Sequence, residues 1–153
     1  MSQPIKVLLS LFLIFSGSSA YASNWFVLSP TIDGGTESVD LSSIVAKGNY
    51  VTAWFMNTSP VEQKFERSFP TVRTDKPYKS IKVHQVINCS KRESATEHIA
   101  YYTDENGGGT YLGSIVAQPS QYTFSSIIPD TLGEQRLDYV CKYNIPRKFK
   151  PAT

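Results

Sequence analysis

Basic and aromatic side chains gather just before the first of the two cysteines, and these residues are the best placed to bind a partner. Lys76, Tyr78, Lys79, Lys82 and His84 fall within a nine-residue stretch. Lysine ammonium groups attract carboxylate or sulfate groups, although each solvent-exposed ion pair contributes only about 0–1 kcal/mol. The stretch therefore predicts a surface for an acidic or sulfated partner. Alternatively, it is an ordinary solvated strand whose lysines discourage edge-to-edge association.

Residues 79–89 alternate in polarity as expected of a half-buried antiparallel strand, whose side chains point to opposite faces in turn. The row predicted to face a core consists of Ile81, Val83, Ile87 and Cys89. The row predicted to face water consists of Ser80, Lys82, His84 and Asn88. If the strand pairing extends back past Pro77, then Lys76, Tyr78, Lys82 and His84 project from one face.

The sequence contains no arrangement typical of catalysis or of metal binding. His84 and His98 are the only histidines; we place them on different strands, with His84 exposed, and they lack the H-E-x-x-H spacing of zinc enzymes. Residues 107–109 are three glycines without the lysine and serine or threonine of a phosphate-binding loop, so they predict a hairpin turn. We therefore expect no enzymatic activity, no metal and no cofactor.

The first 22 residues have the pattern of a secretory signal peptide. Lys6 precedes an apolar run at residues 7–15, and small residues then lead to an A-x-A site that ends at Ala22. The run is about half of the ~20 residues that a membrane-spanning helix needs. We predict cleavage after Ala22, with Ala20 as the alternative position, and export to the periplasm or the cell surface.

The mature chain that this cleavage predicts has 131 residues, enough for one domain with a substantial core. The whole chain has 15 Lys and Arg against 13 Asp and Glu, and only Lys6 lies in the predicted signal peptide, so the mature net charge is +1. This balance predicts no nucleic-acid partner. Cys89 and Cys141 are expected to pair in an exported chain, which would add roughly 4 kcal/mol of stability.

The remaining elements complete an α+β domain. Besides residues 79–89, strands are predicted at 24–28, 36–40, 50–56, 94–103 and 111–117. Thr131 and Glu134 have the spacing of a capping box, and Leu137, Val140 and Cys141 form one apolar stripe of a helix. We predict a single domain at 23–141, an antiparallel sheet of about six strands with one C-terminal helix tied by the disulfide. A basic, flexible tail is expected at 142–153.

The aromatic residues divide into expected core and expected surface groups. The predicted strands carry the expected core residues Trp25, Trp54 and Phe55. Residues 57–77 contain three prolines and several charges and are predicted to form a long, mobile excursion. The loop-like segments carry the candidates for exposed contacts with a partner, namely Phe65, Phe69 and Tyr122.

The order of these features resembles the surface-adhesin protein E family of bacterial exported proteins. The shared features are Trp25 after the signal peptide, D-L-S-S-I at 40–44, a strand bearing Trp54, Y-K-S-I-K-V-H-Q-V-I-N-C at 78–89 and I-I-P-D-T-L-G-E-Q-R-L-D-Y-V-C at 127–141. The resemblance covers nearly the whole mature chain. It implies a small antiparallel sheet with a helix docked through the disulfide.

The resemblance also implies a function. It implies an adhesin that binds host matrix or plasma proteins such as vitronectin. The basic residues themselves add a sulfated glycan as a further candidate partner. The residues implied in binding are Lys76, Tyr78, Lys79, Lys82 and His84. The sequence departs from the best-known adhesin because it lacks a lipidation cysteine and has lysines where arginines would give bidentate contacts. An alternative function is a periplasmic structural or accessory domain that binds another envelope protein.

Overall fold

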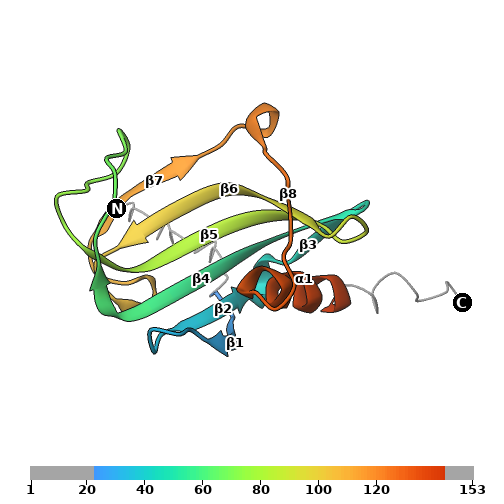
Figure 1. The fold of residues 1–153 in the computed structure, drawn as a ribbon, viewed down its shortest axis with the longest axis horizontal. Helices are drawn as coiled ribbons and strands as arrows, with labels where there is room; N and C mark the ends of the chain where they lie inside the picture. Colours follow the sequence, from blue (N-terminus) through green and yellow to red (C-terminus); the bar gives the residue numbers. More distant parts are fainter. Residues whose placement is uncertain (1–22, 144–153) are drawn as a thin grey trace, which may run out of the picture.

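The computed structural model describes residues 23–143, which form one antiparallel sheet and one C-terminal helix (Figure 1). The strands are β1 (Trp25–Pro30), β2 (Thr36–Asp40), β3 (Val45–Lys47), β4 (Tyr50–Gln63), β5 (Tyr78–Asn88), β6 (Glu93–Tyr102), β7 (Tyr111–Val116) and β8 (Ser125–Ser126). The helices are α1 (Leu132–Tyr143) and the one-turn 3-10 helices η1 (Leu41–Ser43), η2 (Glu105–Gly107) and η3 (Pro119–Gln121). The order in the sheet is β1-β2-β4-β5-β6-β7, with β3 beside β4 and β8 beside β6.

This architecture confirms the predicted single α+β domain. All six predicted strands are present, and β3 and β8 bring the sheet to eight. These two strands have three and two residues, too few to show an alternating pattern in the sequence. The predicted signal peptide at 1–22 and residues 144–153 of the predicted tail lie outside the described residues. Lys142 and Tyr143 were assigned to the tail, but they form the last two positions of α1.

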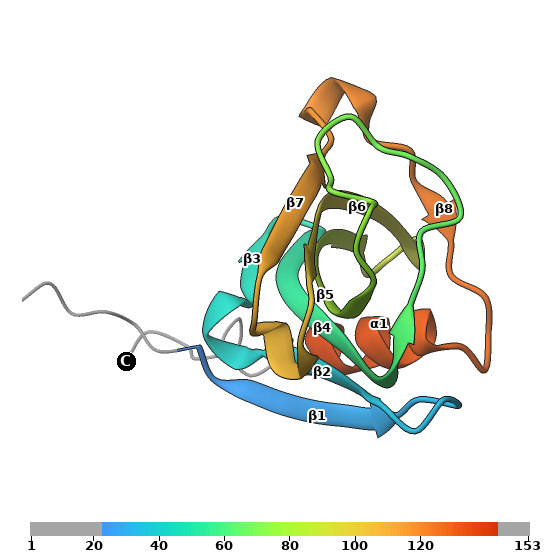
Figure 2. The same cartoon turned by 90° about the vertical axis from the view of Figure 1, so that its left-hand side faces the viewer.

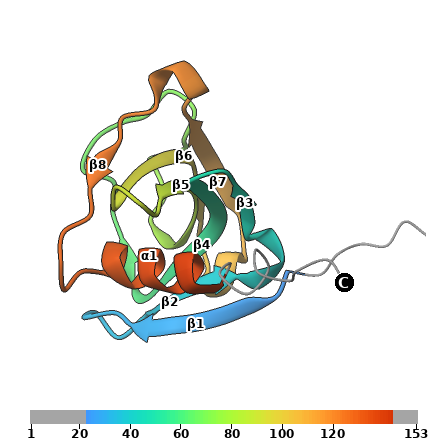
Figure 3. The ribbon, with the colours of Figure 1, turned by 90° about the vertical axis from the view of Figure 1, so that its right-hand side faces the viewer.

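Strands β4 to β7 curve strongly, so the sheet has an inner and an outer face (Figure 2). The inner face carries Phe55, Val83 and Ile87, and the outer face carries Trp54 and Lys82. Register shifts interrupt the ladders from β4 to β7, and such bulges bend strands and increase their twist. The α1 helix packs on the inner face, beside β1 and β4 (Figure 3).

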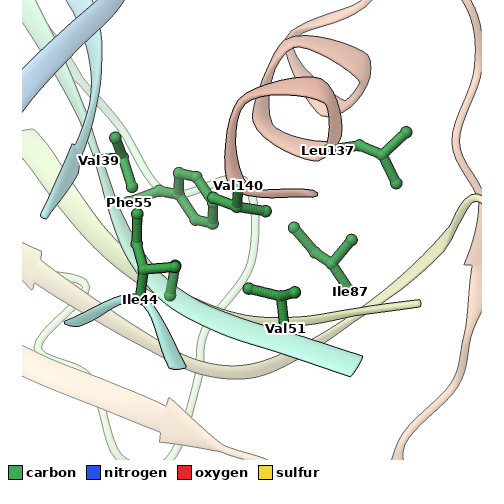
Figure 4. Packing of buried hydrophobic residues seen from close by; sticks show 8 residues of the cluster. Val39, Ile44, Val51, Phe55, Ile87, Leu137 and Val140 are labelled. Carbon is green, nitrogen blue, oxygen red and sulfur yellow. The ribbon is translucent and has the colours of Figure 1, made fainter. Parts of the chain in front are cut away.

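The main core lies between α1 and the inner face (Figure 4). Val39, Phe55 and Ile87 of the sheet are fully buried against Leu137 and Val140 of the helix. Burial of each such side chain contributes about 1.5–3 kcal/mol. The core position of Phe55 and the apolar stripe of the helix are therefore confirmed.

The predicted disulfide links the end of β5 to α1. Cys89 and Cys141 are bonded across a sequence separation of 52, with their Cα atoms 5.8 Å apart. At the start of α1, the Thr131 hydroxyl accepts a hydrogen bond from the Glu134 N–H at 3.4 Å. The Glu134 carboxylate in turn accepts from the N–H of Asp130, one residue before the cap, at 2.8 Å. The predicted capping residues thus secure the helix start, with a shift of one residue in the return bond.

A buried ion pair joins α1 to the sheet. Arg136 donates to the two carboxylate oxygens of Glu37 at 2.7 and 3.0 Å, and to Asn57 at 3.2 Å. Its guanidinium lies 5.0 Å from the centroid of the Phe55 ring. Glu37 is fully buried, and burial raises the pKa of its carboxyl while the charge of Arg136 acts in the opposite direction. The bidentate pair thus fixes the helix to β2, in addition to the disulfide that links it to the end of β5.

The polar row of β5 does not face water as predicted. Ser80 and Asn88 are 1% and 5% exposed, and Lys82 and His84 are half-buried. The Ser80 hydroxyl donates to the backbone oxygen of Asp104 at 2.5 Å, because the loop between β6 and β7 folds back over the outer face. At the other end, the Asn88 side chain accepts hydrogen bonds from the turn that follows β5. Connections that the strand pattern could not reveal therefore cover this row.

The segment predicted as a mobile excursion is largely built into the fold. Its first seven residues continue β4 to Gln63, with a register shift between Thr58 and Gln63. Residues 64–77 then fold onto the sheet, where Val72 bridges to Gly113 of β7. A second core cluster of Val72, Tyr101 and Leu112 also receives Phe65 and Phe69. The prediction that these two phenylalanines are exposed contact residues is wrong, because they anchor the segment to the inner face.

Candidate functional site: an aromatic cleft around Lys82

The five residues predicted to bind a partner do not form one surface. Because β5 begins at Tyr78, Lys76 lies outside the strand, on the exposed segment before it. Tyr78 packs on the rings of Phe65 and Tyr101, at centroid distances of 4.9 and 5.2 Å, and this burial raises the pKa of its hydroxyl. The condition for a shared face, pairing that extends past Pro77, is therefore not met.

Lys79 and Lys82 border different hollows. Lys79 adjoins a hollow that Asn57 and Leu132 also line, near the start of α1. Lys82 pairs with Met56 of β4 and Ala100 of β6 and lines a cleft on the outer face. The structure thus separates the basic stretch, and Lys82 alone of its residues lines this cleft.

This outer cleft has a volume of about 560 Å³ and is lined mainly by aromatic side chains. The lining residues are Ser23, Trp25, Asp40, Trp54, Lys82, His98, Ala100, Tyr102 and Tyr111. They come from the start of β1, the end of β2 and the outer positions of β4 to β7, so the cleft forms only when the whole sheet is assembled. Ligand sites in proteins commonly have this character, with apolar walls and a few polar groups, and volumes of about 300–1,000 Å³.

The ammonium group of Lys82 lies among the rings of this cleft. Its Nζ is 4.9 Å from the centroid of Tyr102 and 5.9 Å from that of Trp25, within the range of cation–π attraction. A Cβ at Gly107 would lie 2.2 Å from Lys82 Cε, so the glycine leaves the space that the lysine end occupies. Within residues 23–143, Lys82 forms no salt bridge. Its charge is therefore available to an anion that enters the cleft.

Asp40 lines the same cleft, but one of its oxygens serves the fold. Oδ1 accepts hydrogen bonds from the N–H groups of Asn24 and Ser42, at 2.9 and 3.0 Å, and from the Ser42 hydroxyl at 2.5 Å. These contacts cap η1, because an aspartate before a helical turn accepts hydrogen bonds from the free N–H groups at its start. Among residues 23–143, all hydrogen bonds to this carboxylate end on Oδ1, so Oδ2 remains an acceptor for a ligand.

Beside the cleft, the two histidines meet across β5 and β6. His84 pairs directly with His98, and Trp54 packs on both rings at centroid distances of 5.0 and 5.2 Å. His84 Nδ1 contacts the carboxylate of Glu97, which a register shift in β6 brings to the same side. The prediction that His84 is exposed is wrong: its side chain is 20% exposed because Trp54 and Glu97 cover it.

Glu97 also ties the segment after β7 to this group. Its carboxylate accepts a hydrogen bond from the Tyr122 hydroxyl, and this bond, followed by those to His84, lowers the pKa of the carboxyl. The same bond raises the pKa of Tyr122 to about 12. Tyr122 was predicted to be an exposed contact residue, but it is half-buried and serves this network.

Sequence reasoning missed the role of the two tryptophans. Trp25 and Trp54 were expected in the core, yet both are half-buried and line the outer cleft. One signal was available, because Val51, Ala53 and Phe55 alternate with Trp54, which places the tryptophan on the other face of its strand. What the sequence could not show is that Trp54 lies opposite His84 and near Lys82.

The cleft has features that are suited to binding. Residues 23–143 contain no group of three or more His, Cys, Asp or Glu side chains that could hold a metal ion. Over the same residues, no helix has the length and apolar character required to cross a membrane. The cleft offers aromatic surfaces, one cation and a carboxylate oxygen, which together fit a ligand with a flat body, an anionic group and hydroxyl donors.

Comparisons with known proteins agree with the fold. The family model described as Surface-adhesin protein E matches residues 25–142. The structure of Haemophilus influenzae protein E is similar with a TM-score of 0.55 and 14% identity, covering 80% of this chain and 86% of that chain. A second crystal form of that protein gives a TM-score of 0.56 at 14% identity, with coverage of 80% and 90%. Among curated proteins, none matches the sequence.

Proposed function

Because the chain belongs to the surface-adhesin protein E family, we propose that it is an exported binding protein that engages a host extracellular protein of the vitronectin type. The observation that supports this proposal is the outer cleft, where the Lys82 ammonium group lies among aromatic rings and has no salt bridge to any described residue. We also propose that the signal peptide is cleaved after Ala22, which places Ser23, at the edge of the cleft, at the mature N-terminus.

The outer face is the better binding surface for two reasons. The inner face is occupied by α1 and by residues 64–77, whereas Lys82, Trp25 and Tyr111 line an open hollow. Aromatic residues are also enriched in protein interfaces because they offer a large apolar area with a polar end. Among the basic residues, we assign the direct contact to Lys82 and only long-range attraction to Lys76 and Lys79. His84 supports the cleft by holding Trp54.

The test is the binding of the purified mature protein to immobilised vitronectin and to heparin over a series of salt concentrations. We expect binding that weakens as salt rises, because the contact is partly electrostatic. Lys82→Ala should reduce the affinity at least tenfold, because loss of one partner of a desolvated charge pair typically costs about 2 kcal/mol or more. The matched control is Lys79→Ala, a lysine three residues away on the same strand that should change the affinity less than twofold.

Two results would contradict the proposal. Absence of binding would favour the alternative of a periplasmic accessory domain. Binding that falls equally in the Lys79→Ala and Lys82→Ala variants would show that only the total charge of the basic stretch matters. A Lys76→Ala/Lys79→Ala/Lys82→Ala variant measures that total, and we expect it to lose little more than Lys82→Ala alone. Circular dichroism of each variant would confirm that the fold is retained.

A further inference from the structure

We propose that the outer cleft binds an acidic sugar unit, of the hexuronic or sialic acid type, with the sugar carboxylate on Lys82 and the sugar ring against Trp25 and Tyr102. The inference deepens the proposed function by naming the chemical class that the cleft recognises on a partner. It rests on three properties of the cleft, namely its walls, its charges and its size.

The walls fit a ring with one apolar side. Trp25, Tyr102 and Tyr111 contribute aromatic surface from three different strands, and the rings of Tyr102 and Tyr111 are paired at 5.6 Å. Among the described lining residues, Ala100 is the only one with a purely aliphatic side chain, so the apolar part of the surface consists mainly of aromatic rings. The C–H side of a pyranose ring can pack on such surfaces, while its hydroxyls reach the hydroxyl groups of the two tyrosines.

The charges select a ligand that is both anionic and rich in hydroxyl groups. Lys82 supplies a cation without a salt bridge in the described chain, which disfavours a cationic ligand and attracts a carboxylate. Asp40 adds a second requirement, because its Oδ2 repels a simple anion but accepts a hydrogen bond from a hydroxyl group. A fatty or dianionic ligand would leave Asp40 unsatisfied, whereas a sugar acid satisfies both residues.

The size is also consistent with a sugar. A volume of about 560 Å³ exceeds the needs of a single small anion and accommodates one or two sugar units. The η2 turn packs against the end of Lys82 at Gly107, and the Ser80 hydroxyl holds this turn by donating to the Asp104 carbonyl and accepting from the Gly107 N–H. The position of Lys82 is thus fixed before a ligand arrives, which limits the entropic cost of binding.

The protein carries its own reporter for this test. Trp25 and Trp54 are its only two tryptophans, and both line the cleft. We would therefore titrate the full mature protein with glucuronic acid and with N-acetylneuraminic acid at fixed pH, and follow the tryptophan fluorescence. Glucose is the matched probe because it has the ring of glucuronic acid without the carboxylate. We expect saturable binding in the millimolar range for at least one acid and binding at least tenfold weaker for glucose.

Two variants test whether the fluorescence change arises from binding in the cleft. Lys82→Met keeps an unbranched side chain of nearly the same length and removes the charge, and it should weaken binding of the acidic sugar at least tenfold. Lys79→Met makes the same change outside the cleft and should alter binding less than twofold. The proposal is overturned if glucose binds as well as glucuronic acid, if the two variants behave alike, or if free glycine, which offers both an ammonium and a carboxylate, competes better than either acid.

Two further experiments distinguish uronic acid from sialic acid and the sugar proposal from the proposed function. Hyaluronan fragments supply uronic acid and sialyllactose supplies sialic acid, so the tighter probe identifies the source. Vitronectin binding that depends on Lys82 without a response to any acidic sugar would reject the sugar and leave the proposed function in place. Saturable binding of an acidic sugar without vitronectin binding would reject vitronectin as the partner and leave the sugar proposal in place.

Discussion

Replacement of Arg136 by alanine should be among the most destabilising single changes outside the apolar core. The guanidinium makes two hydrogen bonds to Glu37 and one to Asn57, and it covers the ring of Phe55. In the Arg136→Ala variant, the fully buried Glu37 carboxylate loses its countercharge. Loss of one partner of a buried pair typically costs about 3–5 kcal/mol. With an urea m-value of about 2 kcal/mol per M, the midpoint of unfolding should fall by about 1.5–2.5 M.

The pH dependence of this variant distinguishes the buried charge from simple loss of packing. Burial already raises the pKa of Glu37, and removal of Arg136 removes the influence that lowers it. A carboxyl whose folded pKa lies above its unfolded value stabilises the fold below the unfolded pKa, and this stabilisation is lost as the pH rises through the folded pKa. The deficit of Arg136→Ala should therefore be larger at pH 7.5 than near pH 4.5.

Equilibrium unfolding in urea, with the disulfide intact and at both pH values, is the assay. The control is the double variant Glu37→Leu/Arg136→Met, which replaces the pair by apolar groups of similar volume and should lie closer to the wild type than Arg136→Ala does. The reasoning is refuted if Arg136→Ala falls within 1 kcal/mol of the wild type. It is also refuted if the double variant is as unstable as the single one.

Two other perturbations test the supports of the sheet. Replacement of Cys89 and Cys141 by alanine should lower the free energy of unfolding by roughly 4 kcal/mol, because the disulfide closes a long loop. Differential scanning calorimetry would measure the change, and an unchanged melting temperature would contradict this prediction. Since the pKa of Tyr122 is raised to about 12, its hydrogen bond to Glu97 should be fully present below pH 10 and lost as the pH rises toward 12. Tyr122→Phe should flatten the fall of stability in that alkaline range, and an unchanged slope would argue against the bond.

The predictable part of the fold consists of features that are local in the sequence. Alternation in residues 79–89 correctly placed Val83 and Ile87 in the core, and the spacing of Leu137 and Val140 correctly predicted the buried stripe of α1. The pairing of the cysteines followed from their number and the expected export. Periodicity and composition act within one segment, so a single sequence reveals them directly.

The features that escaped prediction depend on how distant segments meet. Arg136 and Glu37 are 99 positions apart, and the residues that flank them in the sequence do not indicate that either side chain is buried. Glu97 reaches His84 only because the β5–β6 register shifts by one residue, and no alternating pattern encodes such a bulge. The candidate site is of this kind, because its lining residues come from six strands that must pair in the correct register.

The division of the sheet into two faces explains how this fold can carry a binding site at little cost to its stability. The two core clusters, the Arg136 pair and the disulfide act on the inner face or at its edge, so outer residues such as Trp54 and Lys82 contribute little to that core. Half-buried residues such as Trp54 and Lys82 can therefore vary with the ligand while Phe55 and Val83, their neighbours in the same strands, remain in the core. Substitutions at Lys82 should then alter binding with little change in the urea midpoint, whereas substitutions at Arg136 should do the opposite.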